Sequence, residues 1–474
     1  MVKDLVPCVH FYDQDFVDMY NRTWVWLEEN WHQGDKDGTF PEGFLTYNDE
    51  KVISLYDYAM SSLFLVYSNQ NFSPYSMIDY FYSMQDESGA IPCAIDYTTN
   101  TPIYTESNPK GVTLPLLAYV EFNFYHKIGN KKRLKEIVPK LEKYFSWICE
   151  NYQCSNGLFS VPYEACHTGN IPRENAYYEV DFNAAMAVSA LYLSSIGDVL
   201  NDKELSFRYK RIYFSLKTRI SSMMWDNETK FYYDLDKNED QIKNKYLGAY
   251  WTLLAEIPND ETAMYLIERL KDDKEFGSEN PFCMLPISSK YYSEKGNGYC
   301  GGVVPFFNYI VIKGLLKYDS FIFARECAIR HLYFILDTLH PDADKMGDVW
   351  EVYRPMQEGP SISVDSTFVN KQHYIAMLGL MTITLIIENI IGLDISLPRK
   401  TVNWTMQSLE AMGIEHLSLK RNDITILSNK SSKDWEIRLE SEKLYYFTIE
   451  ILNDKRKKTL PIPSGKCSLL IEKL

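Results

Sequence analysis

A long succession of amphipathic segments, from about residue 12 to residue 391, most constrains how this chain can fold. Within 181–201, apolar side chains recur every three or four residues, which places them on one face of a helix. The segment 203–224 repeats this pattern after a short polar turn, so the two helices should pack as antiparallel neighbours. The same period predicts about a dozen helices, near residues 12–30, 53–68, 75–84, 112–126, 131–152, 181–201, 203–224, 245–255, 259–271, 303–317, 319–338 and 367–391.

Helices paired in this way predict an (α/α)6 barrel, in which inner helices surround a funnel and loops at one end build a site. A solenoid is less favoured, because the sequence shows no internal repeat of fixed length. Long stretches without helical period interrupt the helices at 32–52, 85–111, 154–180, 273–302 and 340–366. Loops of this length in a compact domain are functional or disordered. Their Trp, Tyr, Gly and Pro content favours ordered loops that line a cleft.

The sequence pattern changes after residue 397. Apolar and polar residues alternate through 435–439 and 445–451, and this period of two predicts half-buried strands. Further strands are expected around Leu417/Leu419, around Ile424/Ile426 and from Cys467 to Ile471. We therefore expect a mainly α protein with two domains: an (α/α)6 barrel over residues 1–397 and a small β-sandwich over residues 398–474.

Charge and cysteine content exclude several classes of partner. A net charge of −15 would repel a phosphate backbone, so no nucleic-acid partner is expected. No stretch of about 18 uninterrupted apolar residues occurs, and Met1 to Glu28 lacks the apolar run of a signal peptide, which predicts a cytoplasmic protein without a membrane partner. The nine cysteines and eight histidines show no metal-ligand spacing, so no metal or other cofactor is expected. A monomer and a small homo-oligomer remain open.

The segment 348–355 carries the strongest candidate for catalysis. Glu351 stands there beside Trp350, Tyr353 and Arg354 at the start of a long loop. A carboxylate among such side chains can hold and activate a water molecule next to a sugar ring, which makes Glu351 a candidate general base. The alternative is a surface or helix-capping glutamate without a catalytic role.

Three other segments carry weaker signals. The glycines of 297–309 permit a close backbone approach, so this segment either forms a wall of the site or simply leads into a helix. The segment 163–183 is rich in acidic residues, and Asp181 is expected to act as a helix N-cap. Asp57 lies in a strongly apolar helix, where a charge needs a partner. It is either a ligand to sugar hydroxyls or part of a buried ion pair.

Taken in order, these segments resemble the bacterial members of glycoside hydrolase family 63 and its trehalase-like relatives, including mannosylglycerate hydrolases. The resemblance covers about residues 35–392. The matching positions are Glu351, Tyr353 and Pro355 in the base loop; Gly301, Gly302, Pro305, Asn308 and Tyr309 in the glycine-rich helix entry; Val180 to Ala184 in a helix start; and Asp57 and Gln85 in ligand segments. It implies a carbohydrate substrate and an (α/α)6 barrel.

One position departs from the family pattern. The family has its general acid, an Asp, in a motif that corresponds here to 166–173; Asn170, Pro172 and Arg173 fit, but Gly169 stands at the acid position. Glycine has no proton to donate. We expect Glu164 to replace the acid, because Tyr163 and apolar neighbours favour a protonated carboxyl. Glu174, Glu179 and His167 are alternatives, as are a preference for good leaving groups and a loss of hydrolysis.

The resulting prediction is an inverting, exo-acting hydrolase of α-glucosides or related small glycosides. Its catalytic residues are Glu351 and Glu164, and the expected substrate-binding residues are Asp57, Gln85, Asn108, Arg173, Trp350, Tyr353 and Tyr299. The main alternative is a catalytically impaired carbohydrate-binding protein on the same scaffold, for which Gly169 is the best evidence. An epimerase or polysaccharide lyase is less favoured, because those reactions use His or Tyr/Arg pairs where these loops offer carboxylates.

Overall fold

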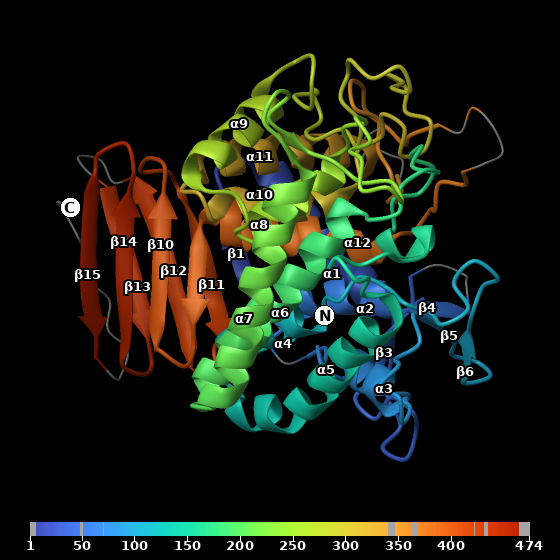
Figure 1. Ribbon diagram of the computed structural model, residues 1–474. Coiled ribbons are helices and arrows are strands. Elements are labelled where there is room, and N and C mark those ends of the chain that lie inside the picture. Colours follow the sequence, from blue (N-terminus) through green and yellow to red (C-terminus); the bar gives the residue numbers. More distant parts are fainter. Residues whose placement is uncertain are drawn as a thin grey trace.

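The computed structural model describes residues 6–47, 51–69, 71–339, 347–362, 364, 368–420, 422–430 and 435–463. Helices fill the first part of the chain and strands the last part (Figure 1). The helices are α1 Gln14–Glu29, α2 Leu55–Leu65, α3 Ser76–Ser83, α4 Leu117–Ile128, α5 Lys131–Tyr152, α6 Val180–Leu200, α7 Lys203–Arg219, α8 Trp251–Leu254, α9 Asp260–Lys271, α10 Pro305–Leu316, α11 Phe321–Leu339 and α12 Ile375–Gly379. A π-helix, η5 Leu380–Ile391, continues α12, and short helical turns occupy η2 Tyr163–Cys166, η3 Ile220–Met224 and η4 Leu247–Tyr250.

Every helix predicted from the sequence has a counterpart, which confirms the mainly helical first part. The main differences lie at the ends: the last helix begins at Ile375 instead of near residue 367, and the expected helix 245–255 consists of η4 followed by α8. The antiparallel pair α6 and α7 packs as predicted. Asn201, in the left-handed region, ends α6, and the Asp202 side chain caps α7 by accepting from the Leu205 N–H at 3.0 Å.

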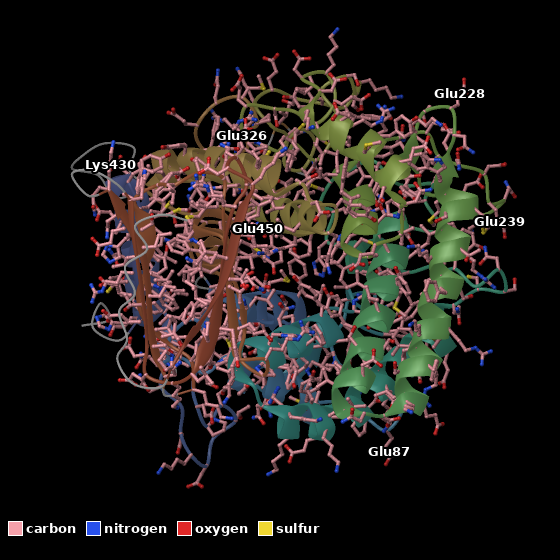
Figure 2. All side chains as sticks on the ribbon, turned by 90° about the vertical axis from the view of Figure 1, so that its left-hand side faces the viewer. Glu87, Glu228, Glu239, Glu326, Lys430 and Glu450 are labelled. Carbon is pink, nitrogen blue, oxygen red and sulfur yellow. The ribbon has the colours of Figure 1, made fainter. Side chains whose placement is uncertain are left out.

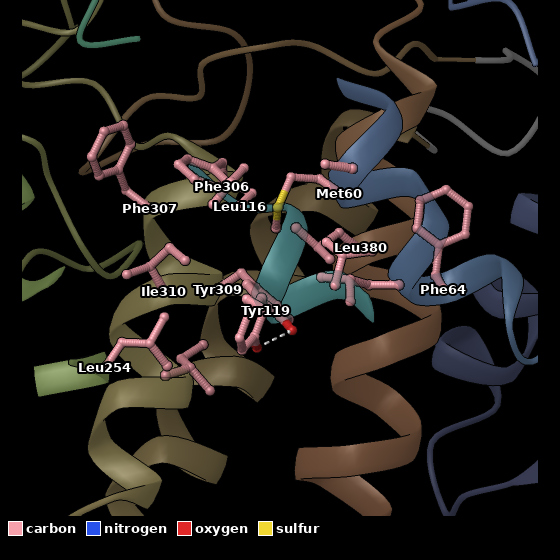
Figure 3. Packing of buried hydrophobic residues seen from close by; sticks show 14 of the residues in the cluster. Met60, Phe64, Leu116, Tyr119, Leu254, Phe306, Phe307, Tyr309, Ile310 and Leu380 are labelled. Carbon is pink, nitrogen blue, oxygen red and sulfur yellow. Dashed lines mark hydrogen bonds between the residues drawn. The ribbon is translucent and has the colours of Figure 1, made fainter. Parts of the chain in front are cut away.

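The even-numbered helices form an inner layer. Contacts run from α2 to α4, α6, α8, α10 and α12 with its extension η5, and from there back to α2. α6 is buried on nearly every face, whereas α7 keeps an exposed polar face. Figure 3 shows side chains of α2, α4, α10 and η5 packed together, among them Phe64, Leu380 and Tyr309. The Tyr119 and Tyr309 hydroxyls share a hydrogen bond of 2.9 Å, so two buried polar atoms satisfy each other.

Two four-stranded sheets form the C-terminal part. The first has the order β1 Cys8–His10, β11 Met412–Ser418, β12 Asp423–Lys430, β13 Trp435–Ser441, and the second has β15 Arg456–Ile462, β14 Tyr445–Ile451, β10 Thr401–Met406, β9 Leu393–Ser396. Alternate residues are buried along β13 and β14, as the period of two predicted, and the same alternation occurs along β10. The strand expected from Cys467 to Ile471 lies outside the described residues.

The first sheet also contains a strand from the other end of the chain. β1 pairs antiparallel with β11, so the N-terminal strand completes a sheet of the C-terminal part (Figure 1). β9 likewise lies before residue 398 and pairs with β10. The boundary at 397/398 stays a prediction, and these two strands show that segments before it contribute to the sheets.

Short strands also occur in the loops between the helices. They are β2 Trp31–His32 with β3 Phe44–Leu45, β4 Val52–Ser54 with β5 Ala94–Asp96 and β6 Thr101–Ile103, and β7 Trp225–Asp226 with β8 Phe231–Tyr232.

Figure 2 shows labelled acidic side chains such as Glu87, Glu228 and Glu239 at the periphery, where water solvates them. Within the described residues, α6 alone is long and apolar enough to cross a membrane, and 72% of its apolar window is buried inside the protein.

A buried ion network anchors the apolar helix η5. Glu388 accepts hydrogen bonds from the Tyr67 hydroxyl at 2.5 Å and from the Lys313 ammonium at 2.7 Å, and it forms an ion pair with Lys127 at 3.2 Å. Lys313 also donates to the Asn389 amide oxygen. Although burial alone would raise it, these cations hold the pKa of Glu388 at about 2, below its usual value of 4.5. The network thus provides partners for Glu388 and Asn389 in a helix whose other polar residues are Thr382 and Thr384.

We predict that Glu388→Gln lowers the free energy of unfolding at pH 7 by about 3–5 kcal/mol, because it leaves two buried lysines with too few acceptors. The pKa of Glu388 is depressed in the folded protein, so its contribution is present above about pH 4.5 and is lost as the pH falls toward 2. Urea unfolding of the wild type and of Glu388→Gln should show that the difference between their free energies of unfolding becomes smaller as the pH is lowered from 7 to 3. A difference that is constant over this range would contradict the prediction.

Candidate active site

A cavity of about 370 Å³ brings together four of the predicted site residues: Glu351, Glu164, Asp57 and Tyr299. They come from segments far apart in the sequence, namely the start of α2, the loop that contains η2, the glycine-rich loop 297–302 and the loop 349–355. Aromatic and apolar side chains form the rest of the wall, among them Tyr56, Phe306 and Phe368. The volume falls in the range of small-molecule sites.

Glu351 is partly buried and held by its surroundings. Its backbone N–H donates to the Lys371 carbonyl at 3.0 Å, and its Oε1 accepts from the Tyr299 hydroxyl at 3.0 Å. Burial raises the pKa of Glu351 above the usual 4.5, and the charge of Asp57 also raises it, while the Lys371 charge and the Tyr299 bond act in the opposite direction. The result is a carboxylate that takes up a proton more readily than an exposed one.

Asp57 lies in the first turn of the apolar helix α2. The Ser54 hydroxyl accepts from the Asp57 N–H at 3.0 Å and donates to its Oδ2 at 2.7 Å, a reciprocal cap of the Ser-x-x-Asp type. Its other oxygen accepts from the Tyr374 hydroxyl at 2.5 Å. Asp57 is 8% exposed, and that exposed edge lines the cavity, where it can accept from a sugar hydroxyl.

Gly169, at the expected acid position, lies directly against Tyr299. Its φ is +53°, and a Cβ built on it would approach Cδ2 of Tyr299 to 2.2 Å. Asn170 fixes this contact, because its side chain donates to the Asn297 carbonyl and accepts from the Tyr299 N–H, both at 2.9 Å. The Tyr299 ring thus occupies the space that a side chain at position 169 would need.

Glu164 lines the same cavity from η2, but it is exposed. Both of its oxygens accept hydrogen bonds from hydroxyls: Thr105 donates to one at 2.7 Å and Ser107 to the other. The two hydroxyls hold the carboxyl of Glu164 in place beside the cavity. The apolar setting expected from the sequence is therefore wrong for this side chain, and its role as the acid stays a prediction.

His167 and Glu179 were alternative acids. The His167 ring lines the cavity, stacks on Tyr56 at 3.9 Å and bonds the Thr113 hydroxyl through Nε2; burial lowers its pKa to about 3, so the ring is neutral near pH 7. Burial raises the pKa of Glu179 to about 8, as required of an acid, but this residue is absent from the described lining of the cavity.

Gln85, Asn108 and Arg173 do not line this cavity. The Gln85 amide donates to the backbone of Gly89 and Lys140, and Asn108 bonds both backbone groups of Val112, so each braces a loop. Arg173 is buried in ion pairs with Asp181 and Asp234, at 3.0 and 2.8 Å. Asp181, expected to be the helix N-cap, lies instead in the first turn of α6, where Arg173 binds it.

Trp350 and Tyr353 flank Glu351 in the sequence, and both pack against the hydrophobic core. Tyr353 is 2% exposed, and its hydroxyl accepts from the Trp350 N–H at 3.2 Å, which braces the loop from behind. Neither belongs to the described lining of the cavity. Sequence reasoning missed Lys371 and Tyr374, which do line it; the segment 370–374 shows no motif that would have revealed them. Ser54 could have been found from its spacing of three residues before Asp57.

Among the described residues, no group of three or more His, Cys, Asp or Glu side chains is arranged to hold a metal ion. The cavity instead offers carboxylates, phenols, a lysine and a neutral imidazole. Such groups can bind hydroxyls and move protons, which is the chemistry of general acid–base catalysis.

We predict that Gly169→Ala destabilises the protein by about 1–3 kcal/mol, the usual cost of overpacking, because the added methyl meets the Tyr299 ring. Gly359→Ala is the control for backbone strain: the φ of Gly359, +103°, is less favourable for alanine than the +53° of Gly169, but no atom lies within 4 Å of an added Cβ. Urea unfolding should show a larger loss for Gly169→Ala than for Gly359→Ala. Equal losses would mean that backbone strain, not contact with Tyr299, excludes a side chain.

Comparison with known proteins gives two matching family models. The mannosylglycerate hydrolase MGH1-like glycoside hydrolase domain matches residues 165–365, and the trehalase C-terminal domain matches residues 392–474. The first range contains Gly169, Tyr299 and Glu351. The range of the trehalase C-terminal domain begins at Gly392, which links η5 to β9. The second range contains the strands β9 to β15, whereas the cavity residues on α2, Glu164 and the segment 368–377 lie outside both ranges.

Individual proteins extend this result. An uncharacterized protein of Borreliella burgdorferi is 46% identical over 482 residues, which cover 100% of both chains. A GH63 mannosylglycerate hydrolase from Thermus thermophilus, in complex with glucose, has a TM-score of 0.60 at 15% identity, over 77% of this chain and 99% of its own. The neutral trehalase of Saccharomyces cerevisiae has a TM-score of 0.52 at 14% identity, over 75% and 76%. These two structures share the fold. The chain belongs to the glycoside hydrolases that are related to mannosylglycerate hydrolase and trehalase.

Proposed function

We propose that this protein is an inverting, exo-acting glycoside hydrolase for α-glucosides or related small glycosides, with Glu351 as its general base. One observation carries the proposal: the Glu351 carboxylate opens on the cavity, is oriented by Tyr299, and has a pKa raised by burial. A carboxylate with a raised pKa is a stronger base toward water.

The helix contacts support the architecture that this function needs. The closed succession of neighbours from α2 through α12 and back to α2 fits the inner ring of an (α/α)6 barrel, with the odd-numbered helices outside it. The cavity lies among long loops and at the starts of α2, α10 and α12. A cavity of about 370 Å³ suits a small glycoside better than a long polysaccharide.

Inversion requires a base on one side of the sugar and an acid on the other, about 6.5–9.5 Å apart. Glu351 takes a proton from the water that attacks the anomeric carbon, while the glycosidic oxygen leaves on the opposite face. Asp57, with both oxygens oriented by hydroxyl donors, binds a sugar hydroxyl. Glu164 is the carboxyl of the η2 loop that lines the cavity, and we assign it the acid role.

A catalytically impaired carbohydrate-binding protein is the second candidate, because Gly169 leaves no carboxyl at the family's acid position. A screen of glycosides with product detection, beside calorimetric binding of the same compounds, distinguishes the two. Product formation with inverted anomeric configuration supports the hydrolase. Binding without turnover of any glycoside favours the second candidate.

We expect Glu351→Gln to reduce kcat by about 10²–10⁴-fold, because the amide keeps the shape of the carboxylate but takes no proton from water. Turnover of the best substrate from the screen measures the effect, and calorimetry should show that sugar binding remains. Glu326→Gln, which changes an exposed glutamate on α11, is the matched control and should keep full activity. Near-native activity of Glu351→Gln would refute the base assignment.

If Glu164 is the acid, Glu164→Gln should lose about 10²-fold or more on an alkyl glucoside but far less on 4-nitrophenyl glucoside, whose leaving group departs without a proton. Glu174→Gln is the matched control, since Glu174 is exposed on the same loop and lies outside the described lining of the cavity. Equal losses of Glu164→Gln on the two substrates would remove Glu164 from the acid role.

A further inference from the structure

The loop that carries Glu351 is held by hydrogen bonds at successive residues. The Glu351 N–H donates to the Lys371 carbonyl at 3.0 Å, and the Val352 N–H to the Asn370 side chain at 3.1 Å. Tyr353 exchanges two backbone bonds with Val303, at 2.8 and 2.9 Å. Up to this point, the neighbouring loops of the cavity itself supply the partners.

Asn280 holds the next two residues of the loop, Arg354 and Pro355. Its side-chain amide donates to the Arg354 carbonyl at 3.0 Å, and its backbone N–H donates to the Pro355 carbonyl at 2.8 Å. Asn280 is fully buried. One residue therefore holds both carbonyls that follow Tyr353, and the direction of its amide determines whether the first bond can form.

His331 on α11 determines that direction. Its Nδ1 lies 2.7 Å from Asn280 Oδ1, and because an amide oxygen can only accept, Nδ1 carries the proton. His331 is also fully buried, and burial lowers its pKa to about 3, so the ring is neutral at physiological pH. Among the described residues, its Nε2 has no hydrogen-bond partner. The His331 and Tyr353 rings lie nearly perpendicular to each other, with their centroids 6.4 Å apart, so His331 also neighbours the loop that carries Glu351.

We propose that Asn280 and His331 are positioning residues of the active site: His331 orients the Asn280 amide, and Asn280 fixes the loop so that Glu351 faces the cavity. The inference rests on the proposed function of Glu351. Its physical basis is that a misplacement of about 1 Å in a catalytic group costs about 10²-fold in rate, so a base on a loop needs a rigid support.

The first test compares Asn280→Ala with Ser278→Ala. Ser278 donates to the Asn280 carbonyl at 2.6 Å, so its loss perturbs the same segment but leaves the Asn280 side chain in place. On the best glycoside of the screen, Asn280→Ala should lower kcat by about 10²-fold with KM nearly unchanged, and Ser278→Ala should keep kcat. Equal kcat values for the two variants would overturn the proposal.

A second pair of variants separates hydrogen bonding from packing. In His331→Asn the amide nitrogen replaces Nδ1 as the donor to Asn280, whereas His331→Leu fills space without a donor. The donor-retaining variant should keep most of the wild-type kcat, and the leucine variant should approach Asn280→Ala. If both variants have the same kcat at comparable folded fractions, His331 acts only through packing and the proposal fails for it.

The third readout does not need turnover, so it separates failure of this inference from failure of the proposed function. Titration of the ¹³C-labelled glutamate carboxyls, with Glu351 assigned by its loss in Glu351→Gln, gives the pKa of Glu351 directly. The hydrogen bond from Tyr299 lowers the pKa of Glu351, and a displaced loop would lose this bond. In Asn280→Ala the pKa of Glu351 should therefore rise toward the pKa that Glu351 has in Tyr299→Phe. An unchanged titration in Asn280→Ala would contradict the positioning role even if no glycoside is hydrolysed.

Discussion

Helices that are apolar on nearly every face are stable in water only when other helices surround them. α6, α10 and η5 are of this kind, and the remaining structure follows from their burial. Each inner helix contacts its predecessor and its successor, and the last contacts the first. The amphipathic outer helices turn their polar faces to water. Polar groups that cannot enter this core, apart from compensated clusters such as the one at Glu388, gather in the loops and helix ends.

This division explains why the site lies where it does. Ser54 and Asp57 open α2, and Tyr374 immediately precedes α12, so two helix starts meet across the cavity. The loops add Glu351 and Tyr299. The contact of Tyr299 with Gly169 is the most unusual feature of the arrangement, because a single ring bonds the proposed base and covers the position where the family's acid is expected.

The sequence revealed the helices and the strands β11 to β14, because periods of 3.6 and two are local properties, whereas β1, β9, β10 and β15 of the same sheets were not predicted. It also indicated Glu351 and Asp57, since a carboxylate in an apolar or aromatic context stands out. Gln85, Asn108 and Arg173 lie outside the described lining of the cavity and bind neighbouring protein groups, because spacing along a loop does not tell which way a side chain turns. Trp350 and Tyr353 show the same limit. The roles of all these residues in binding sugar remain untested predictions.

The pairing of β1 with β11 has a consequence for how the chain is made. The His10 ring and the Glu415 carboxylate, 2.7 Å apart in the folded protein, are separated by 405 positions in the sequence. During translation, β1 therefore emerges from the ribosome long before β11 has been synthesised. Until then, the backbone N–H and C=O groups of β1 cannot form their hydrogen bonds with β11. This sheet can be completed only after β11, β12 and β13 have been synthesised, so β1 finds its partner later than any of the helices find theirs.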